Sequence, residues 1–193
     1  MNSEFEYIGF GKRVAMSIVE LIVVSVPFVF LYTTSLRMAV QWESVIPFIL
    51  QWMLVISLLI FMITRYGATP GKLIMKAKIV DRNGNYLSVG RAVLRLVIYS
   101  LNSILLVFAL DAAIRHGVPY EEVGGFISDY EGEDGFHIAR MAAGVIAIID
   151  IVWLFLNRKR RTLHDLLAGS YVVSVDSYHK NKAEQGSSHS LTH

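Results

Sequence analysis

The apolar residues of the chain fall into four unbroken blocks separated by polar segments. The blocks cover Val14–Tyr32, Val45–Ile63, Leu96–Ile114 and Ile138–Leu156. Each is close to the ~20 residues that an α-helix needs to cross the hydrocarbon core of a bilayer. The pattern therefore predicts an all-α membrane protein with four transmembrane helices.

The first block follows Lys12 and Arg13, which is also how a cleaved signal peptide begins. Its apolar stretch is too long for the hydrophobic region of a typical signal peptide, and no Ala-x-Ala cleavage pattern follows it. We therefore interpret it as a transmembrane helix that is retained.

Composition supports an integral membrane protein. Of 193 residues, 54% are hydrophobic and only 18% are charged, whereas a soluble domain carries about 25% charged residues. The chain has no cysteine, which excludes disulfides, thiol catalysis and cysteine-ligated metal centres.

The basic residues predict how the chain is oriented. Fifteen of the 18 lie on one side of the predicted helices. They are Lys12, Arg13, Arg65, Lys72, Lys76, Lys78, Arg82, Arg91, Arg95, Arg158, Lys159, Arg160, Arg161, Lys180 and Lys182. The segment Glu121–Asp134, on the other side, holds six acidic residues and is expected to be solvated. Because basic loops stay in the cytoplasm, we expect both termini there. The net charge of +2 is then explained by the basic residues beside the membrane spans, and no nucleic-acid partner is expected.

Two short segments predict a small cytoplasmic sheet. Leu73–Asp81 alternates for part of its length and leads to Asn83-Gly84, a strong hairpin signal, after which Tyr86-Leu-Ser would return. Tyr171–Val175 is a second run rich in β-formers. A lone hairpin is marginally stable, so we expect both segments to contribute to one sheet.

The segments flanking this sheet are expected to differ in order. Val89–Arg95 should begin a helix that continues into the third span, with Arg91 and Arg95 reaching lipid headgroups. The polar residues 176–193 are expected to form a disordered cytoplasmic tail behind a membrane domain covering residues 1–175.

Glu20 and Asp150 are the main candidates for function, because ionisable groups inside a membrane span are costly. Each lies seven or eight positions from the basic boundary of its span, about 10–12 Å into the membrane at ~1.5 Å per residue. Asn102 and Ser57 lie at similar depths in the other two spans. Two carboxylates, an amide and a hydroxyl would suit a small hard cation or a proton.

A purely structural role remains open for these four residues. Asp150 shares a helix face with Ala143 and Ala147, so we expect it to point into the bundle. A buried carboxylate could simply pair with Arg13, Arg140 or a donor on another helix and fix the packing. An amide or hydroxyl inside a bundle commonly serves only as a bond between helices.

Other motifs do not predict an enzyme. Gly67–Lys72 resembles a phosphate loop, but three residues separate its glycines where four are needed, and Leu73 follows the lysine. His164 and Asp165 have no nucleophile at a recognisable spacing. The histidines lack metal-ligand spacing, so neither a cofactor nor a metal ion is predicted.

Several segments together resemble the RDD family of small prokaryotic membrane proteins, named for an arginine and two aspartates. They are Gly9-Phe-Gly-Lys-Arg13, Gly67-Ala-Thr-Pro-Gly-Lys72, Ile79-Val-Asp81, Gly90-Arg-Ala-Val-Leu-Arg95 and Arg161-Thr-Leu-His-Asp-Leu-Leu-Ala-Gly169. The resemblance makes Arg13 the family arginine and Asp165 the final aspartate, with Gly71, Lys72 and His164 as further motif positions. The family's aspartate in the first helix corresponds to Glu20, whose side chain is one methylene longer.

The resemblance implies transport, for which cation/proton antiport is proposed in some family members. We also expect Arg13 and Asp165 to form an ion pair between the first span and the end of the fourth. In the leading interpretation, Glu20 and Asp150 alternately hold a proton or a monovalent cation. Four helices are few for a transporter, which favours a homodimer. Its seam could use Ala139, Ala143 and Ala147, although these small residues also serve packing within one subunit.

The competing interpretation is a membrane adaptor that does not transport. Its cytoplasmic sheet and basic face would bind a protein partner or anionic lipid. Neutralising Glu20 and Asp150 would separate the two, because only a transporter would lose flux while remaining folded.

Overall fold

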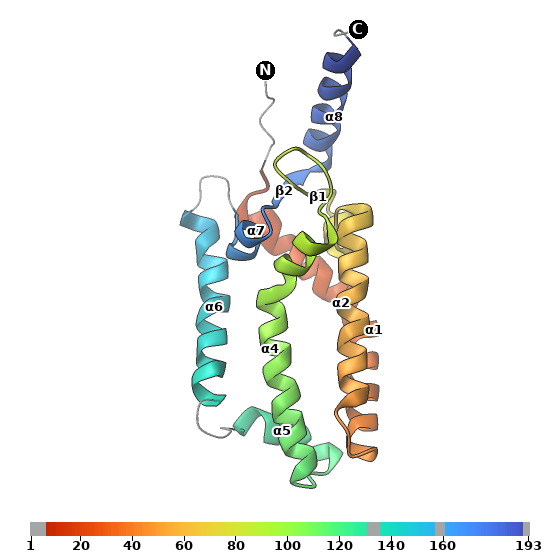
Figure 1. Cartoon of the computed structure of the whole chain (residues 1–193), viewed down its shortest axis with the longest axis vertical. Coiled ribbons are helices and arrows are strands. Elements are labelled where there is room, and N and C mark those ends of the chain that lie inside the picture. The colour runs from red at the N-terminus through yellow and green to blue at the C-terminus, as the bar shows by residue number, and fades with distance from the viewer. Residues whose placement is uncertain (1–6, 131–135, 157–160, 191–193) are drawn as a thin grey trace. The chain divides into compact units, whose positions relative to one another are not determined.

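The computed structural model describes residues 7–130, 136–156 and 161–190, without the side chains of residues 184–190. In chain order the elements are α1 (Phe10–Gln41), α2 (Ile46–Tyr66), α3 (Pro70–Ile74), β1 (Ala77–Val80), α4 (Val89–Arg115), α5 (Tyr120–Asp129), α6 (Phe136–Leu156), α7 (Leu163–Leu167), β2 (Tyr171–Ser174) and α8 (Val175–Ser190) (Figure 1). The acidic positions among residues 131–134 and the basic positions 158–160 lie outside the described residues.

The helices α1, α2, α4 and α6 confirm the four predicted spans. Each contains an 18-residue window with a mean hydropathy of at least 2.1. The two shortest, α2 and α6, have 21 residues each. At ~1.5 Å per residue this length matches the hydrocarbon thickness of a bilayer. Large apolar side chains along them are exposed, among them Leu21 at 69% and Val26 at 77%. Lipid can cover such a surface, while the helices satisfy their own backbone hydrogen bonds.

The described chain forms two compact units, and α1, α2, α4 and α6 contribute to both. The first unit comprises Met1–Val24, Leu59–Arg95 and Asp150–His193, and the second comprises Ser25–Leu58 and Leu96–Ile149. The candidate site residues divide between them: Arg13, Glu20, Gly71, Lys72, Asp150, His164 and Asp165 belong to the first unit, and Ser57 and Asn102 to the second.

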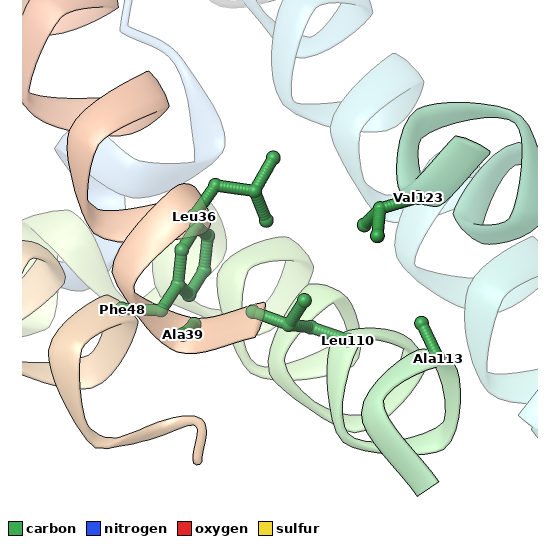
Figure 2. Packing of buried hydrophobic residues seen from close by; sticks show 6 residues of the cluster. All are labelled: Leu36, Ala39, Phe48, Leu110, Ala113 and Val123. Atoms are coloured by element: carbon green, nitrogen blue, oxygen red, sulfur yellow. The ribbon is translucent and has the colours of Figure 1, made fainter. Parts of the chain in front are cut away.

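The second unit has an apolar core supplied by α1, α2, α4 and α5. Its buried side chains are Leu36, Ala39, Phe48, Leu110, Ala113 and Val123 (Figure 2). The acidic residues Glu121, Glu122 and Asp129 lie in the helix α5 and are exposed, as expected of a solvated segment. Glu121 and Glu122 occupy the first turn of this helix, where carboxylates interact favourably with the helix dipole. Val123 is fully buried in the core.

The first unit contains the predicted sheet, but its strands pair differently from the prediction. β1 and β2 are antiparallel, with Ala77 opposite Ser174 and Val80 opposite Tyr171. The prediction of a local hairpin with residues 86–88 is therefore wrong. Burial favours β2 as the partner, because Val172 and Val173 are almost completely buried.

The expected turn at Asn83-Gly84 is present even though no hairpin follows it. Gly84 has φ 78°, a left-handed conformation that glycine adopts without steric cost. Asp81 Oδ1 accepts hydrogen bonds from the backbone N–H groups of Asn83 and Asn85, at 2.8 and 2.9 Å. This Asx-type turn leads the chain toward the start of α4, which begins at Val89 as predicted.

The polar tail differs from the expected disorder, because residues 175–190 form α8. Ser174 Oγ accepts the backbone N–H of Ser177 at 3.3 Å, as an N-cap residue does. Tyr178 stacks on Tyr86 with ring centroids 5.8 Å apart, and Lys182 Nζ donates to Asn85 Oδ1 at 3.1 Å. These contacts supply the anchoring that the low hydrophobicity of the segment does not.

Candidate functional site

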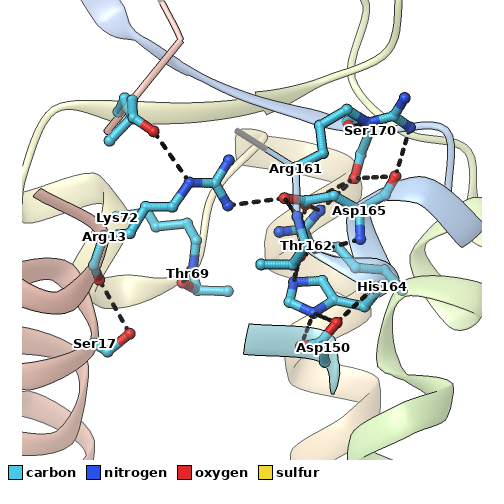
Figure 3. Close-up of polar contacts among 12 residues, drawn as sticks. Arg13, Ser17, Thr69, Lys72, Asp150, Arg161, Thr162, His164, Asp165 and Ser170 are labelled. Carbon is cyan, nitrogen blue, oxygen red and sulfur yellow. Dashed lines mark hydrogen bonds and ion pairs between the residues drawn. The ribbon is translucent and has the colours of Figure 1, made fainter. Parts of the chain in front are cut away.

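Asp165, in α7, is fully buried and holds two arginines from different helices. Arg13 Nη1 of α1 donates to Asp165 Oδ2 at 2.8 Å (Figure 3). Arg95 Nη1 of α4 donates to Asp165 Oδ1. The predicted pair of Arg13 and Asp165 is therefore confirmed. The prediction that Arg95 reaches lipid headgroups is wrong, because its side chain is only 5% exposed. The more peripheral Arg91 lies 3.6 Å from Asp81 with 46% of its side chain exposed.

The charges around Asp165 fix its ionisation state. Burial alone would raise the pKa of this carboxyl, but the guanidinium groups of Arg95 and Arg13 outweigh burial and hold the pKa well below its ordinary value. Asp165 is thus a permanent anion at any physiological pH. A carboxylate held in this way serves as a structural junction and is not free to exchange protons.

Side chains also stabilise α7 itself, a helix of only five residues. Thr162 Oγ1 accepts the backbone N–H of Asp165, and Asp165 Oδ2 accepts the backbone N–H of Thr162, which makes a capping box. At the other end, Arg161 donates to the carbonyl oxygens of Asp165 and Ser170, at 2.9 and 3.0 Å. The short helix can therefore hold Asp165 in place.

Asp150 is buried near the end of α6, as predicted, and its partner is His164. The backbone N–H of His164 donates to Asp150 Oδ1 at 2.7 Å, and His164 Nδ1 lies 2.7 Å from Asp150 Oδ2. Figure 3 shows the imidazole pointing toward the carboxylate. Arg140, considered above as a partner for this carboxylate, instead donates to the carbonyl oxygens of Ser128 and Tyr130.

The second nitrogen of His164 has a different neighbour. Nε2 lies 3.1 Å from Thr162 Oγ1, whose oxygen already accepts the N–H of Asp165. Burial lowers the pKa of His164 and outweighs the opposing effect of Asp150, so the imidazole is neutral at pH 7. The tautomer that satisfies both neighbours carries its hydrogen on Nδ1, which donates to Asp150. Nε2 then accepts the hydroxyl hydrogen of Thr162.

Glu20 lies within α1 and binds the start of α3. Its Oε2 accepts the hydroxyl of Thr69 at 2.5 Å and the backbone N–H of Gly71 at 3.1 Å. Thr69 is the N-cap residue of α3, so Glu20 satisfies a backbone donor that the helix itself leaves unpaired. Lys72 Nζ donates to Thr69 Oγ1 at 3.2 Å. Among the residues that the structure describes, Glu20 has no cationic partner within ion-pair distance.

Gly71 explains why the Gly67–Lys72 motif contains its second glycine. A Cβ atom at this position would lie 2.7 Å from the backbone oxygen of Met16 and from the backbone nitrogen of Glu20. Only glycine lets the backbone of α3 approach α1 this closely. The motif thus shapes the surroundings of the Glu20 carboxylate.

Ser57 and Asn102, the two remaining candidates, are less buried than Glu20 and Asp150. Ser57 and Asn102 are exposed, on α2 and α4 respectively. The patch expected from all four residues stays a prediction.

Sequence reasoning missed Arg95 and Thr162 as members of the cluster. Thr162-x-x-Asp165 is a recognisable capping-box signature that could have found the threonine. Arg95 ends one of the segments that resemble the family, but its position at a membrane boundary was explained by topology alone.

Within the described residues, no group of three or more histidine, aspartate or glutamate side chains forms a metal site. No curated protein and no solved structure matches the chain. The model of the RDD family matches residues 7–169, a range that includes Arg13, Glu20, Asp150 and the complete α7. Since this match extends over most of the sequence, the chain belongs to the RDD family, a family of membrane proteins.

Proposed function

We propose that the protein exchanges a monovalent cation for a proton across a prokaryotic inner membrane, with both termini in the cytoplasm. Glu20 is the residue that binds the cation, and Asp150 is the residue at which a proton competes. A homodimer would supply the further helices that alternating access requires.

The observation that supports this proposal is the difference among the three buried or half-buried carboxylates. Asp165 is neutralised by Arg13 and Arg95. Asp150 is bound to a titratable imidazole. Glu20, in contrast, is held by a hydroxyl and a backbone amide, which carry no net charge.

A carboxylate inside a membrane span is costly unless a cation or a proton neutralises it. Glu20 therefore has a reason to bind either one, and the Thr69 hydroxyl oxygen beside it is a second ligand of the kind that hard cations prefer. Lys72 lies one hydroxyl away, since its ammonium group contacts Thr69 Oγ1. It provides a tethered positive charge that can approach Glu20 while the site holds no ion.

The test is ion-driven proton movement in proteoliposomes, measured separately with sodium, lithium and potassium. Glu20→Gln should abolish exchange but remain folded, because the amide oxygen of glutamine can still accept the hydrogen bonds of Thr69 and Gly71. Asp150→Asn should reduce exchange. The matched control is Asp111→Asn, since Asp111 pairs with Arg115 on its own helix and its side chain is 42% exposed.

Unchanged flux in Glu20→Gln would contradict the assignment of the cation site. The absence of flux with all three cations, from folded wild-type protein, would contradict exchange altogether. The adaptor interpretation would then gain support, and the search would move to partners of the sheet and α8.

A further inference from the structure

We propose that His164 is a proton relay for Asp150, receiving a proton at Nε2 and passing one from Nδ1 to the carboxylate. The proposal rests on the function proposed above, because it assumes that Asp150 is protonated during the working cycle. It assigns to His164 a role beyond the packing of α7.

The relay is built from three side chains in a continuous series. Thr162 Oγ1 lies 3.1 Å from His164 Nε2, and His164 Nδ1 lies 2.7 Å from Asp150 Oδ2. Thr162 Oγ1 is also 3.3 Å from the backbone N–H of Asp165, which donates to it. The imidazole thus bridges the membrane carboxylate in α6 and the polar groups at the start of α7 (Figure 3).

The step balances as a proton transfer through the ring. At rest Nδ1 carries a hydrogen and Nε2 accepts the hydroxyl hydrogen of Thr162. An incoming proton binds Nε2 after the hydroxyl rotates, so that its oxygen becomes the acceptor. The Nδ1–H bond then breaks and an O–H bond forms on Asp150 Oδ2. One proton has entered, and both products, a neutral imidazole and a carboxylic acid, are uncharged.

The charged groups around His164 favour transfer over storage of the proton. Asp150 in α6 faces Nδ1, while Asp165 in α7 lies 3.8 Å from Nε2. Arg95 in α4 acts on the ring through its positive charge. Burial and Arg95 disfavour the imidazolium, and the two carboxylates favour it. Asp165 cannot take the proton itself, since Arg13 and Arg95 neutralise it.

The first experiment reads the resting tautomer of His164 by nitrogen-15 NMR of histidine-labelled protein in lipid nanodiscs. His164→Gln identifies its signal among the six histidines of the chain. We expect a neutral ring with hydrogen on Nδ1 at pH 7.5 and a titration midpoint below the ordinary ~6.5. Asp150→Asn should lower that midpoint further, and Glu20→Gln should leave it unchanged. A ring with hydrogen on Nε2, or a charged ring at pH 7.5, would overturn the relay.

The second experiment measures exchange by His164→Gln across pH. Glutamine can donate a hydrogen bond to Asp150 but cannot relay a proton, so the maximal rate should fall at least about tenfold. The cation concentration for half-maximal rate should stay close to that of wild type. Asp111→Asn, which lies outside the relay, should keep the wild-type rate. Thr162→Val should lower the rate as His164→Gln does, because it removes the hydroxyl next to Nε2.

The two experiments separate this inference from the proposed function. If wild-type protein exchanges ions and His164→Gln does so with the same rate and pH profile, the relay is refuted and exchange stands. If wild-type protein does not exchange ions, the proposed function fails, and the proposed role of His164 in it fails as well.

Discussion

The charge of Asp165 is the feature whose removal should destabilise the protein most, and Asp165→Asn tests this. The substitution keeps the size of the side chain and one acceptor for the capping box, but it leaves Arg13 and Arg95 without their counter-ion. Both guanidinium groups are well buried, with side chains 12% and 5% exposed. Breaking a buried ion pair by removing one partner costs about 3–5 kcal/mol. Two arginines share this carboxylate, so we expect the upper part of that range.

The control is Asp111→Asn. It removes an ion pair between two more exposed residues that lie four positions apart on one helix. Asp111 and Arg115 lie 2.7 Å apart on α4, and their side chains are 42% and 71% exposed. Such a pair contributes about 0.3–0.5 kcal/mol. The structure therefore predicts a difference of several kcal/mol between two identical chemical changes, set by burial and by the number of cations involved.

The assay is reversible unfolding in mixed micelles with increasing sodium dodecyl sulfate, followed by far-ultraviolet circular dichroism. A loss of less than about 1 kcal/mol in Asp165→Asn, or a loss no greater than in Asp111→Asn, would refute the reasoning. A charge swap with Arg13 is a poorer test, because the new arginine at position 165 would face Arg95. A double-mutant cycle of Arg13→Gln with Asp165→Asn avoids this problem, and we expect a coupling energy of about 1–3 kcal/mol.

Three further predictions concern the packing, pH dependence and tail. Gly71→Ala should destabilise the protein in the same unfolding assay, because the new Cβ would lie 2.7 Å from backbone atoms of α1. The control Gly90→Ala places its Cβ in open space and should be neutral or slightly stabilising. Folding lowers the pKa values of both His164 and Asp165, so the unfolded state binds more protons than the folded state. The free energy of unfolding should therefore decrease as the pH falls below about 6.5, because of His164, and again below about 4, because of Asp165. A free energy of unfolding that increases on acidification would contradict this reasoning. Tyr178→Ala should remove the aromatic stack that anchors α8, worth about 0.5–1.5 kcal/mol, and should speed amide hydrogen exchange in that helix while Tyr178→Phe does not.

The spans and the pair of Arg13 and Asp165 could be predicted from the sequence for different reasons. A span is encoded locally, because about 20 consecutive apolar residues satisfy the bilayer whatever surrounds them. The pair required only that two opposite charges lie at the same boundary of adjacent segments. Arg95 has the same charge as Arg13 and also lies at the boundary of a span. Whether Arg95 is buried, however, depends on where α7 places the Asp165 carboxylate. That placement is tertiary information.

The strand pairing and α8 illustrate a second kind of limit. Asn83-Gly84 encodes a turn, and the turn is present, but a turn alone does not choose the partner of β1. The partner is the buried strand that contains Val172 and Val173, which lies some ninety residues away. The α8 segment is likewise too polar to predict its own order, and its anchoring depends on Tyr86 in a remote loop.

The junction at Asp165 has a consequence for how the protein is made. Arg13 and Asp165 are 152 positions apart, and translation at about 5–20 residues per second separates their synthesis by about 8–30 seconds. Throughout that interval Arg13 and later Arg95 have no access to the carboxylate that neutralises them. Both arginines must therefore stay in contact with water, lipid phosphate or the insertion machinery until the last helical turn before β2 has been made. A nascent chain stopped before residue 165 would keep all its spans yet carry two unneutralised cations, a distinctive signal by which quality control could recognise an unfinished molecule.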